Sequence, residues 1–184
     1  MIYSRVQNKF ELKLLRSYWI KDDGLTDNND LCSHGIVHLE IGDETLSDIN
    51  TDGWCTTAAG LHLMRNLYSN YNPGDFEGQL IPCCGHLMFF NEDGSRIEIY
   101  GCNSGIDWKI RHTNNFVELN TEKGESIIID FNLYKTAILN FASEVEAFYG
   151  NPSKKIIPDN ELDRDTFEMF WIEWNSLKSE IVKF

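Results

Sequence analysis

The sequence predicts a single α+β domain, spanning residues 1–184, in which a mainly antiparallel sheet of about five to seven strands is packed by about three helices. Three observations lead to this prediction. The 184 residues are 42% hydrophobic and 12% aromatic, which is enough for one buried core. Short alternating apolar stretches, separated by turns rich in Asn, Asp and Gly, gather in the middle of the chain. Longer segments with helical spacing of apolar residues lie beside them and near the end.

The first strands are indicated by alternation. Apolar Phe10, Leu12 and Leu14 alternate with charged residues, which predicts a strand. Residues 21–30, KDDGLTDNND, then form a polar, turn-rich loop. The stretch HGIVHLEIGD, residues 34–43, alternates again and predicts a second strand.

The helices follow from a spacing of three to four residues between apolar side chains. A first helix is expected within residues 51–71, with Asp52 or Thr56 as its cap. Residues 85–130 alternate as an antiparallel meander. A second helix is expected at about 132–149, capped by Asp130 or Asn132 and ended by Gly150. A linker at 151–158 leads to a third helix at about 162–178.

The charge balance limits the classes of partner. Sixteen Lys and Arg stand against 29 Asp and Glu, a formal net charge of −13. A surface of that sign repels phosphate backbones and attracts a basic protein, so we expect a protein partner and no nucleic acid. No apolar stretch is long enough to span a bilayer, and the first residues lack a signal-peptide core. We therefore expect no membrane partner and a cytoplasmic location.

The cysteines raise the question of a metal centre. Five cysteines cannot all pair within one chain, so we expect free thiols in a reducing compartment. Cys83, Cys84, His86 and Cys102 are the candidate zinc ligands. Adjacent residues of an extended chain point to opposite sides, so Cys83 and Cys84 make a poor chelating pair. No cofactor motif is present, and a thiol or zinc centre at these residues remains one alternative.

A second alternative is nucleophilic catalysis. Cys55 stands directly before the first expected helix, where the helix dipole and free N–H groups favour a thiolate. His86 follows on a later strand, and Asn91 or Asp107 could orient it. This order of cysteine and histidine resembles that of the papain-like cysteine hydrolases. The resemblance implies a hydrolase or amidase with Cys55 as nucleophile and His86 as base.

The C-terminal helix carries an aromatic stripe of Phe167, Phe170, Trp171 and Trp174. The stripe either packs on the sheet or leaves Trp171 and Trp174 exposed to a partner. Acidic residues surround it, namely Asp163, Asp165 and Glu168 together with Glu161 and Glu173. Small, acidic, Trp-rich proteins of this kind resemble the immunity proteins that neutralise bacterial toxins. The leading hypothesis is therefore a non-enzymatic binding protein that holds a basic protein partner, and the oligomeric state stays open.

Overall fold

The structure is a computed structural model and describes residues 9–21, 23–76, 78–85 and 87–183. These residues form nine strands, three α-helices and one short 3-10 helix, η1. The strands make three antiparallel sheets. The α+β class and the number of helices are confirmed, while the strand count is higher than expected.

The largest sheet contains β1 (Phe10–Tyr18), β2 (His34–Ile41), β3 (Glu44–Ser47) and β4 (Trp54–Cys55). Burial alternates strictly along β2, where Val37, Leu39 and Ile41 face the core at 0% exposure. This is the alternation that the sequence predicts. β3 and β4 are additional strands. β4 pairs with Gly35 and His34 of β2. These residues are distant in the sequence, so the two apolar residues of β4 alone do not predict a strand.

The expected meander is divided into two separate sheets. β5 (Leu87–Phe90) and β6 (Ile97–Tyr100) form a hairpin, whereas β7 (Lys109–Thr113), β8 (Phe116–Asn120) and β9 (Ser126–Asp130) form a three-stranded sheet. The segment between β6 and β7 turns away to form an isolated bridge from Ile106 to Ile81. Among the described residues, β6 and β7 do not pair with each other.

The helices are α1 (Thr56–Arg65), α2 (Phe131–Tyr149) and α3 (Glu161–Lys183), with η1 (Pro152–Lys154) between the last two. Asp130 caps α2 by accepting from the N–H groups of Asn132 and Leu133, and Gly150 ends it with a φ of 74°. Both features agree with the sequence. The cap of α1 differs from the expectation, because residues before Thr56 belong to β4 and Cys55 becomes the N-cap.

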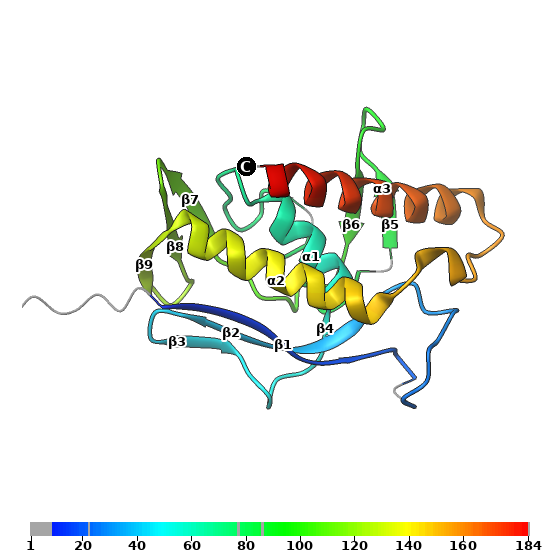
Figure 1. Cartoon of the computed structure of the whole chain (residues 1–184), viewed down its shortest axis with the longest axis horizontal. Helices are drawn as coiled ribbons and strands as arrows, with labels where there is room; N and C mark the ends of the chain where they lie inside the picture. The colour runs from blue at the N-terminus through cyan, green and yellow to red at the C-terminus, as the bar shows by residue number, and fades with distance from the viewer. Residues whose placement is uncertain (1–8, 22, 77, 86, 184) are drawn as a thin grey trace, which may run out of the picture.

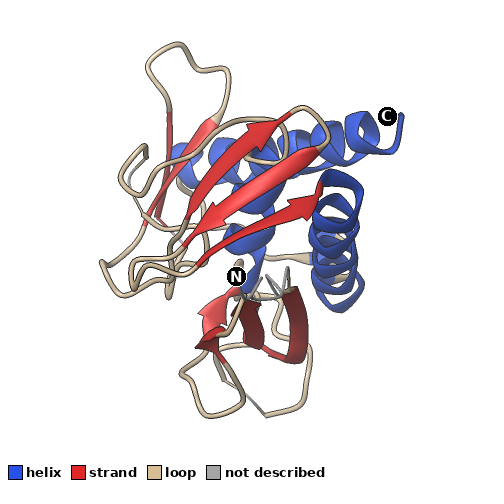
Figure 2. Cartoon of the chain, turned by 90° about the vertical axis from the view of Figure 1, so that its left-hand side faces the viewer, coloured by secondary structure: helices blue, strands red, loops and turns tan. Residues whose placement is uncertain are grey.

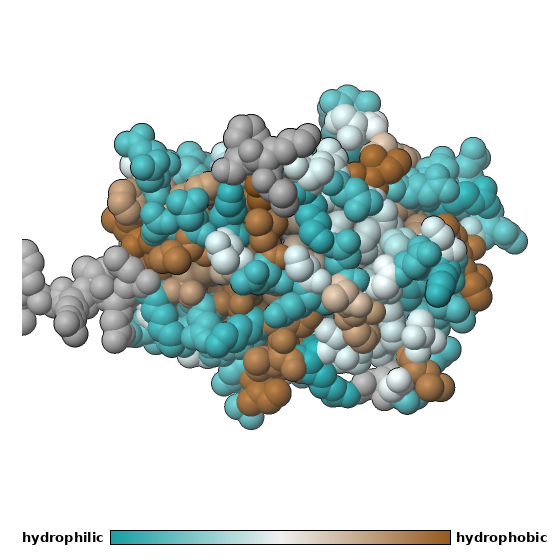
Figure 3. Space-filling model, viewed as in Figure 1, coloured by the Kyte–Doolittle hydropathy of each residue, from teal (hydrophilic) through white to brown (hydrophobic). Residues whose placement is uncertain are grey.

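The elements form layers around one core. α2 lies along the sheet of β1, β2 and β3, α1 rises from β4 of the same sheet beside α2, and α3 lies above α1 in Figure 1. The three-stranded sheet stands at one end of the molecule, beside the helices (Figure 2). The described residues include no helix that is long and apolar enough to cross a bilayer. The face drawn in Figure 3 is mostly hydrophilic, with separate apolar areas and no single continuous patch.

Candidate functional site

A groove at the start of α3 corresponds best to the predicted partner surface, and we call it the α3-start groove. It has a volume of about 530 Å³ and lies between the loop after β1, the start of β5 and the start of α3. Its lining residues are Ile20, Lys21, Asp27, Asn29, Asp30, Leu31, Leu87, Met88, Pro158, Asp163 and Thr166. The groove therefore joins the polar loop 21–30 to the acidic beginning of the C-terminal helix, two segments that both lie toward the right-hand end of Figure 1.

The loop wall of this groove is held to the segment before α3. Lys155 Nζ donates to the carbonyl oxygen of Asp27 at 2.7 Å, and the N–H of Ile156 donates to the carbonyl of Asn28 at 2.8 Å. Burial lowers the pKa of Lys155 to about 8. These hydrogen bonds hold the loop, at Asp27 and Asn28, to the segment before α3.

Exposed apolar side chains supply part of the groove surface. Ile20 is 72% exposed and Leu87 is 49% exposed, although both are large and hydrophobic. Leu162, one residue before the lining residue Asp163, is 40% exposed. Large apolar side chains are exposed elsewhere too, Leu133 and Ile172 among them, but Ile20 and Leu87 line one groove together with charged residues.

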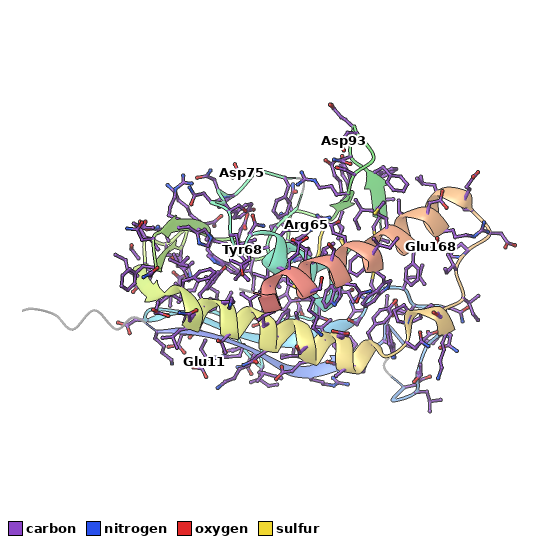
Figure 4. All side chains as sticks on the ribbon, turned by 45° about the horizontal axis from the view of Figure 1, so that its top comes forward. Glu11, Arg65, Tyr68, Asp75, Asp93 and Glu168 are labelled. Atoms are coloured by element: carbon purple, nitrogen blue, oxygen red, sulfur yellow. A yellow bond between two sulfur atoms is a disulfide. The ribbon has the colours of Figure 1, made fainter. Side chains whose placement is uncertain are left out.

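The beginning of α3 is strongly acidic. Within residues 159–168, five carboxylates stand against Arg164 alone; they are Asp159, Glu161, Asp163, Asp165 and Glu168. Asp165 and Glu168 are exposed, and Asp163 lines the groove. Glu168 is labelled on α3 in Figure 4. Such a concentration of one charge raises the local potential and favours approach of a cation.

The aromatic residues predicted to bind the partner lie inside the protein. Trp171 is 8% exposed and Trp174 is fully buried, with the rings of Phe170 and Trp174 stacked at a centroid distance of 5.9 Å. The amphipathic helix buries its aromatic stripe in the core because that removes the largest apolar area from water. Trp171 and Trp174 are therefore core residues, and the prediction that they are exposed to a partner is wrong. The exposed apolar side chains that line the groove are instead Ile20 and Leu87.

The predicted nucleophile, Cys55, lies at the N-terminus of α1 with no exposed surface. A hydrogen bond with the Cys32 thiol lowers the pKa of the Cys55 thiol, and the N–H of Ala58 acts in the same direction. The Cys55 sulfur also lies 3.6 Å from Thr57 Oγ1. The thiol thus has partners inside the protein, and its burial separates it from any substrate in solution.

The other two residues of the predicted catalytic group do not complete it. His86 lies outside the described residues. Asp107 accepts from the hydroxyl of Tyr71 at 2.8 Å and from the N–H of Leu80 at 3.3 Å. Burial raises the pKa of Asp107 to about 6. These contacts give Asp107 a role in joining the segments around Tyr71 and Leu80.

Asp107 lines a larger cleft of about 1080 Å³, which the sequence did not reveal. In this cleft the Nδ1 atom of His62 lies 2.8 Å from the carbonyl oxygen of Gln79, and burial lowers the pKa of His62 to about 3. Arg65, seen beside α3 in Figure 4, donates from Nε and Nη2 to the two carboxylate oxygens of Glu173, each at 2.6 Å. His62 and Arg65 thus have partners in the protein, whereas the side-chain oxygen of Gln79, another lining residue, is buried without a hydrogen-bond partner.

The predicted zinc ligands Cys83, Cys84 and Cys102 do come together. Their sulfurs lie within 4.8 Å of one another, and Cys83 and Cys102 form a disulfide. The expectation of five free thiols is therefore wrong. The expectation that Cys83 and Cys84 point to opposite sides is also wrong, because the chain bends at Cys83 and the rule for extended strands does not apply. His86, the fourth predicted ligand, lies outside the described residues.

Sequence reasoning missed the two exposed apolar residues of the α3-start groove. The stretch LMFF, residues 87–90, is apolar throughout and gives no alternation to show which side faces water. In the structure Leu87 and Phe89 are exposed and Met88 is buried. The one available signal for Ile20 was its position at the boundary between an apolar strand and the polar loop.

No protein-family model matches this chain, and neither a curated protein nor a solved structure is detectably similar to it. The arrangement of its own residues is therefore the basis for assigning a function.

Proposed function

We propose that this chain is a non-enzymatic binding protein that holds a basic protein partner at the α3-start groove. The observation that carries the proposal is the meeting of two acidic segments, 21–30 and 159–168, around a groove with exposed apolar walls. Residues 21–30 contain four Asp and one Lys, and residues 159–168 contain five acids and one Arg. Immunity proteins, which this chain resembles in composition, also neutralise a partner by binding it.

The two kinds of surface have different tasks in this proposal. The carboxylates attract a partner rich in Lys and Arg and speed the encounter, an effect that salt screens. Ile20 and Leu87 bury an apolar side chain of the partner, which provides affinity that salt does not remove. A suitable partner segment therefore carries basic residues on both sides of an apolar anchor.

The hydrolase alternative receives less support from the same structure. It needs a Cys55 thiol that a substrate can reach, and the sulfur lies in the core at 0% exposure. A raised thiolate fraction in a buried cysteine does not by itself produce a nucleophile for solution substrates. The binding function is therefore the one that the geometry favours.

A defined peptide pair tests the proposal. The first fluorescein-labelled peptide carries two leucines between blocks of arginine, and the second has glycine in place of both leucines with the same charge. We expect the chain to bind the leucine peptide more tightly, by fluorescence anisotropy, and both peptides more weakly as salt increases. The double variant Ile20→Ser, Leu87→Ser should bind the leucine peptide with roughly tenfold lower affinity.

Two matched variants separate the groove from the general surface. Leu133 is 69% exposed on α2, so Leu133→Ser makes the same type of change at a distant position and should leave binding unaltered. Asp165→Lys should weaken both peptides more than Asp43→Lys, which reverses an exposed charge at the turn between β2 and β3. Equal effects of the groove and control variants, or no preference for the leucine peptide, would refute the proposal.

A further inference from the structure

Three cysteine sulfurs meet at the open end of the β5–β6 hairpin. Leu87 pairs with Tyr100 at that end of the ladder, so the chain before β5 and the chain after β6 leave the hairpin side by side. Cys83 and Cys84 belong to the first segment and Cys102 to the second. The register of one hairpin therefore explains why residues separated by 19 positions form a disulfide.

The third sulfur is part of the same cluster. Cys84 Sγ lies 3.8 Å from Cys83 Sγ and accepts a hydrogen bond from the N–H of Cys102 at 3.2 Å. An N–H donor to sulfur is a usual outer contact of a metal-bound cysteine. A disulfide between Cys83 and Cys102 that served only to stabilise the fold would not need the sulfur of Cys84 beside it.

The backbone holds the cluster closely. A Cβ atom added at Gly101 would lie 3.0 Å from the carbonyl oxygen of Cys84, so a side chain at residue 101 would press the two segments apart. A Cβ atom at Gly85 would lie 2.6 Å from Cβ of Ala58 and 2.8 Å from the Cys55 sulfur, and the N–H of Cys55 donates to the carbonyl oxygen of Pro82 at 2.9 Å, so this segment packs closely against the start of α1. The positions of the three sulfurs are therefore set by packing and not by the disulfide alone.

The cluster is also reachable from solution. Cys102 is exposed and Cys83 and Cys84 are half-buried, whereas Cys32 and Cys55 are buried. Thiolates are the preferred ligands of soft or borderline cations. In a tetrahedral zinc site with Zn–S bonds of about 2.3 Å, neighbouring sulfurs are about 3.8 Å apart. The separation of the Cys83 and Cys84 sulfurs matches this spacing.

We propose that Cys83, Cys84 and Cys102 form a redox-gated site for Zn²⁺. In the oxidised protein two of the sulfurs are bonded to each other and cannot bind the metal. A dithiol reductant cleaves the Cys83–Cys102 bond, transfers two electrons and two protons, and leaves as a cyclic disulfide. Zn²⁺ then forms three Zn–S bonds and displaces the three thiol protons to solvent, and its fourth position takes a water molecule.

Titration with Co²⁺ tests this site in the full chain, because Co²⁺ bound to cysteine shows sulfur-to-metal charge transfer and the visible bands of a tetrahedral ion. After reduction by a dithiol and removal of the reductant without air, we expect one Co²⁺ per chain, displaced by one Zn²⁺. The oxidised chain should not show these bands. Cys84→Ser should weaken Zn²⁺ binding by more than roughly tenfold, whereas Cys32→Ala should leave it unchanged.

The outcomes are distinct. A reduced, folded chain that gives no sulfur-to-cobalt band overturns the proposal, as does a Cys84→Ser variant that binds metal like the wild type. If a variant fails to fold by circular dichroism, the comparison of oxidised and reduced wild-type protein still decides. Metal binding that is equal in both redox states would show that the disulfide does not gate the site.

Discussion

Lys155 places its ammonium nitrogen 3.2 Å from the centre of the Trp19 ring and 4.8 Å from the centre of the Tyr149 ring. The same nitrogen donates to the carbonyl oxygen of Asp27. A cation above an aromatic face is stabilised by the ring electrons, and more strongly when it is removed from water. One lysine therefore joins the segment before α3 to the loop that forms a wall of the α3-start groove.

Replacing this lysine should loosen the groove wall. Lys155→Met keeps an apolar stem over the rings but removes the charge and the donor, so we expect the free energy of unfolding to fall by roughly 1–3 kcal/mol. Hydrogen exchange at the Ile156 amide, which donates to Asn28, should become faster. Lys154→Met at the exposed neighbouring residue is the control. Equal exchange rates in the two variants would contradict this role of Lys155.

The packing of α1 against α3 leaves no room for a methyl group at residue 60. A Cβ atom on Gly60 would lie 2.5 Å from Cη2 of the buried Trp174. Alanine improves helix propensity by about 1 kcal/mol, but overpacking costs typically 1–3 kcal/mol. Gly60→Ala should therefore lower stability in urea unfolding. In a Trp174→Phe background the same change should be neutral or stabilising, and additivity of the two changes would exclude the proposed contact.

The buried imidazole of His62 should make the protein sensitive to acid. Its pKa in the folded state is about 3 against an ordinary value of 6.5. Below pH 6.5 the unfolded chain therefore binds a proton that the folded chain does not, so this contribution to stability is present above pH 6.5 and lost as the pH falls. We expect a loss of about 2 kcal/mol between pH 7 and pH 5 from this group.

His62→Gln isolates that contribution, because glutamine can still donate to the Gln79 carbonyl but does not titrate. Asp107, whose raised pKa acts with the opposite sign between its ordinary value and about 6, is present in both proteins and cancels in the comparison. Urea unfolding at pH 7 and pH 5 should show a smaller loss for the variant. The same loss in both proteins would place the acid sensitivity elsewhere.

The five cysteines should differ in their reaction with iodoacetamide under native conditions. Without reductant, we expect Cys84 to be labelled first, because Cys32 and Cys55 are buried and Cys83 and Cys102 form a disulfide. After reduction, Cys83 and Cys102 should also react, while Cys32 and Cys55 stay protected until unfolding. Peptide mass spectrometry measures each site. Rapid labelling of Cys55 in the folded protein would contradict this prediction and support the hydrolase alternative.

Local chemistry made part of this fold predictable. The ends of α2 follow from a carboxylate that caps the first N–H groups and a glycine that adopts positive φ, and both signals lie within a few residues of the helix. The alternation in β2 likewise follows from its own sequence. β4 could not be predicted in this way, since Trp54 and Cys55 form a strand only by pairing with residues about twenty positions earlier.

The candidate sites show the same division. The charge of Asp163, Asp165 and Glu168 is visible in the sequence, and the structure places Asp165 and Glu168 at the surface and Asp163 in the groove, while their role in binding stays a prediction. The burial of Trp171 and Trp174 depends on whether another element covers their face of α3. The convergence of Cys83 and Cys84 depends on a bend that replaces an extended chain. Both features depend on contacts with other parts of the fold, so the sequence of one segment does not predict them.

The central claim is that the α3-start groove is the binding surface for a basic partner. Backbone amide chemical shifts, recorded while the leucine-containing cationic peptide is added, test that claim most directly. The predicted result is that the largest shifts fall within residues 20–31, 87–88 and 158–166, and that they disappear in the Ile20→Ser, Leu87→Ser variant. Shifts centred on the larger cleft around His62 and Asp107, or spread evenly over the acidic surface, would contradict it.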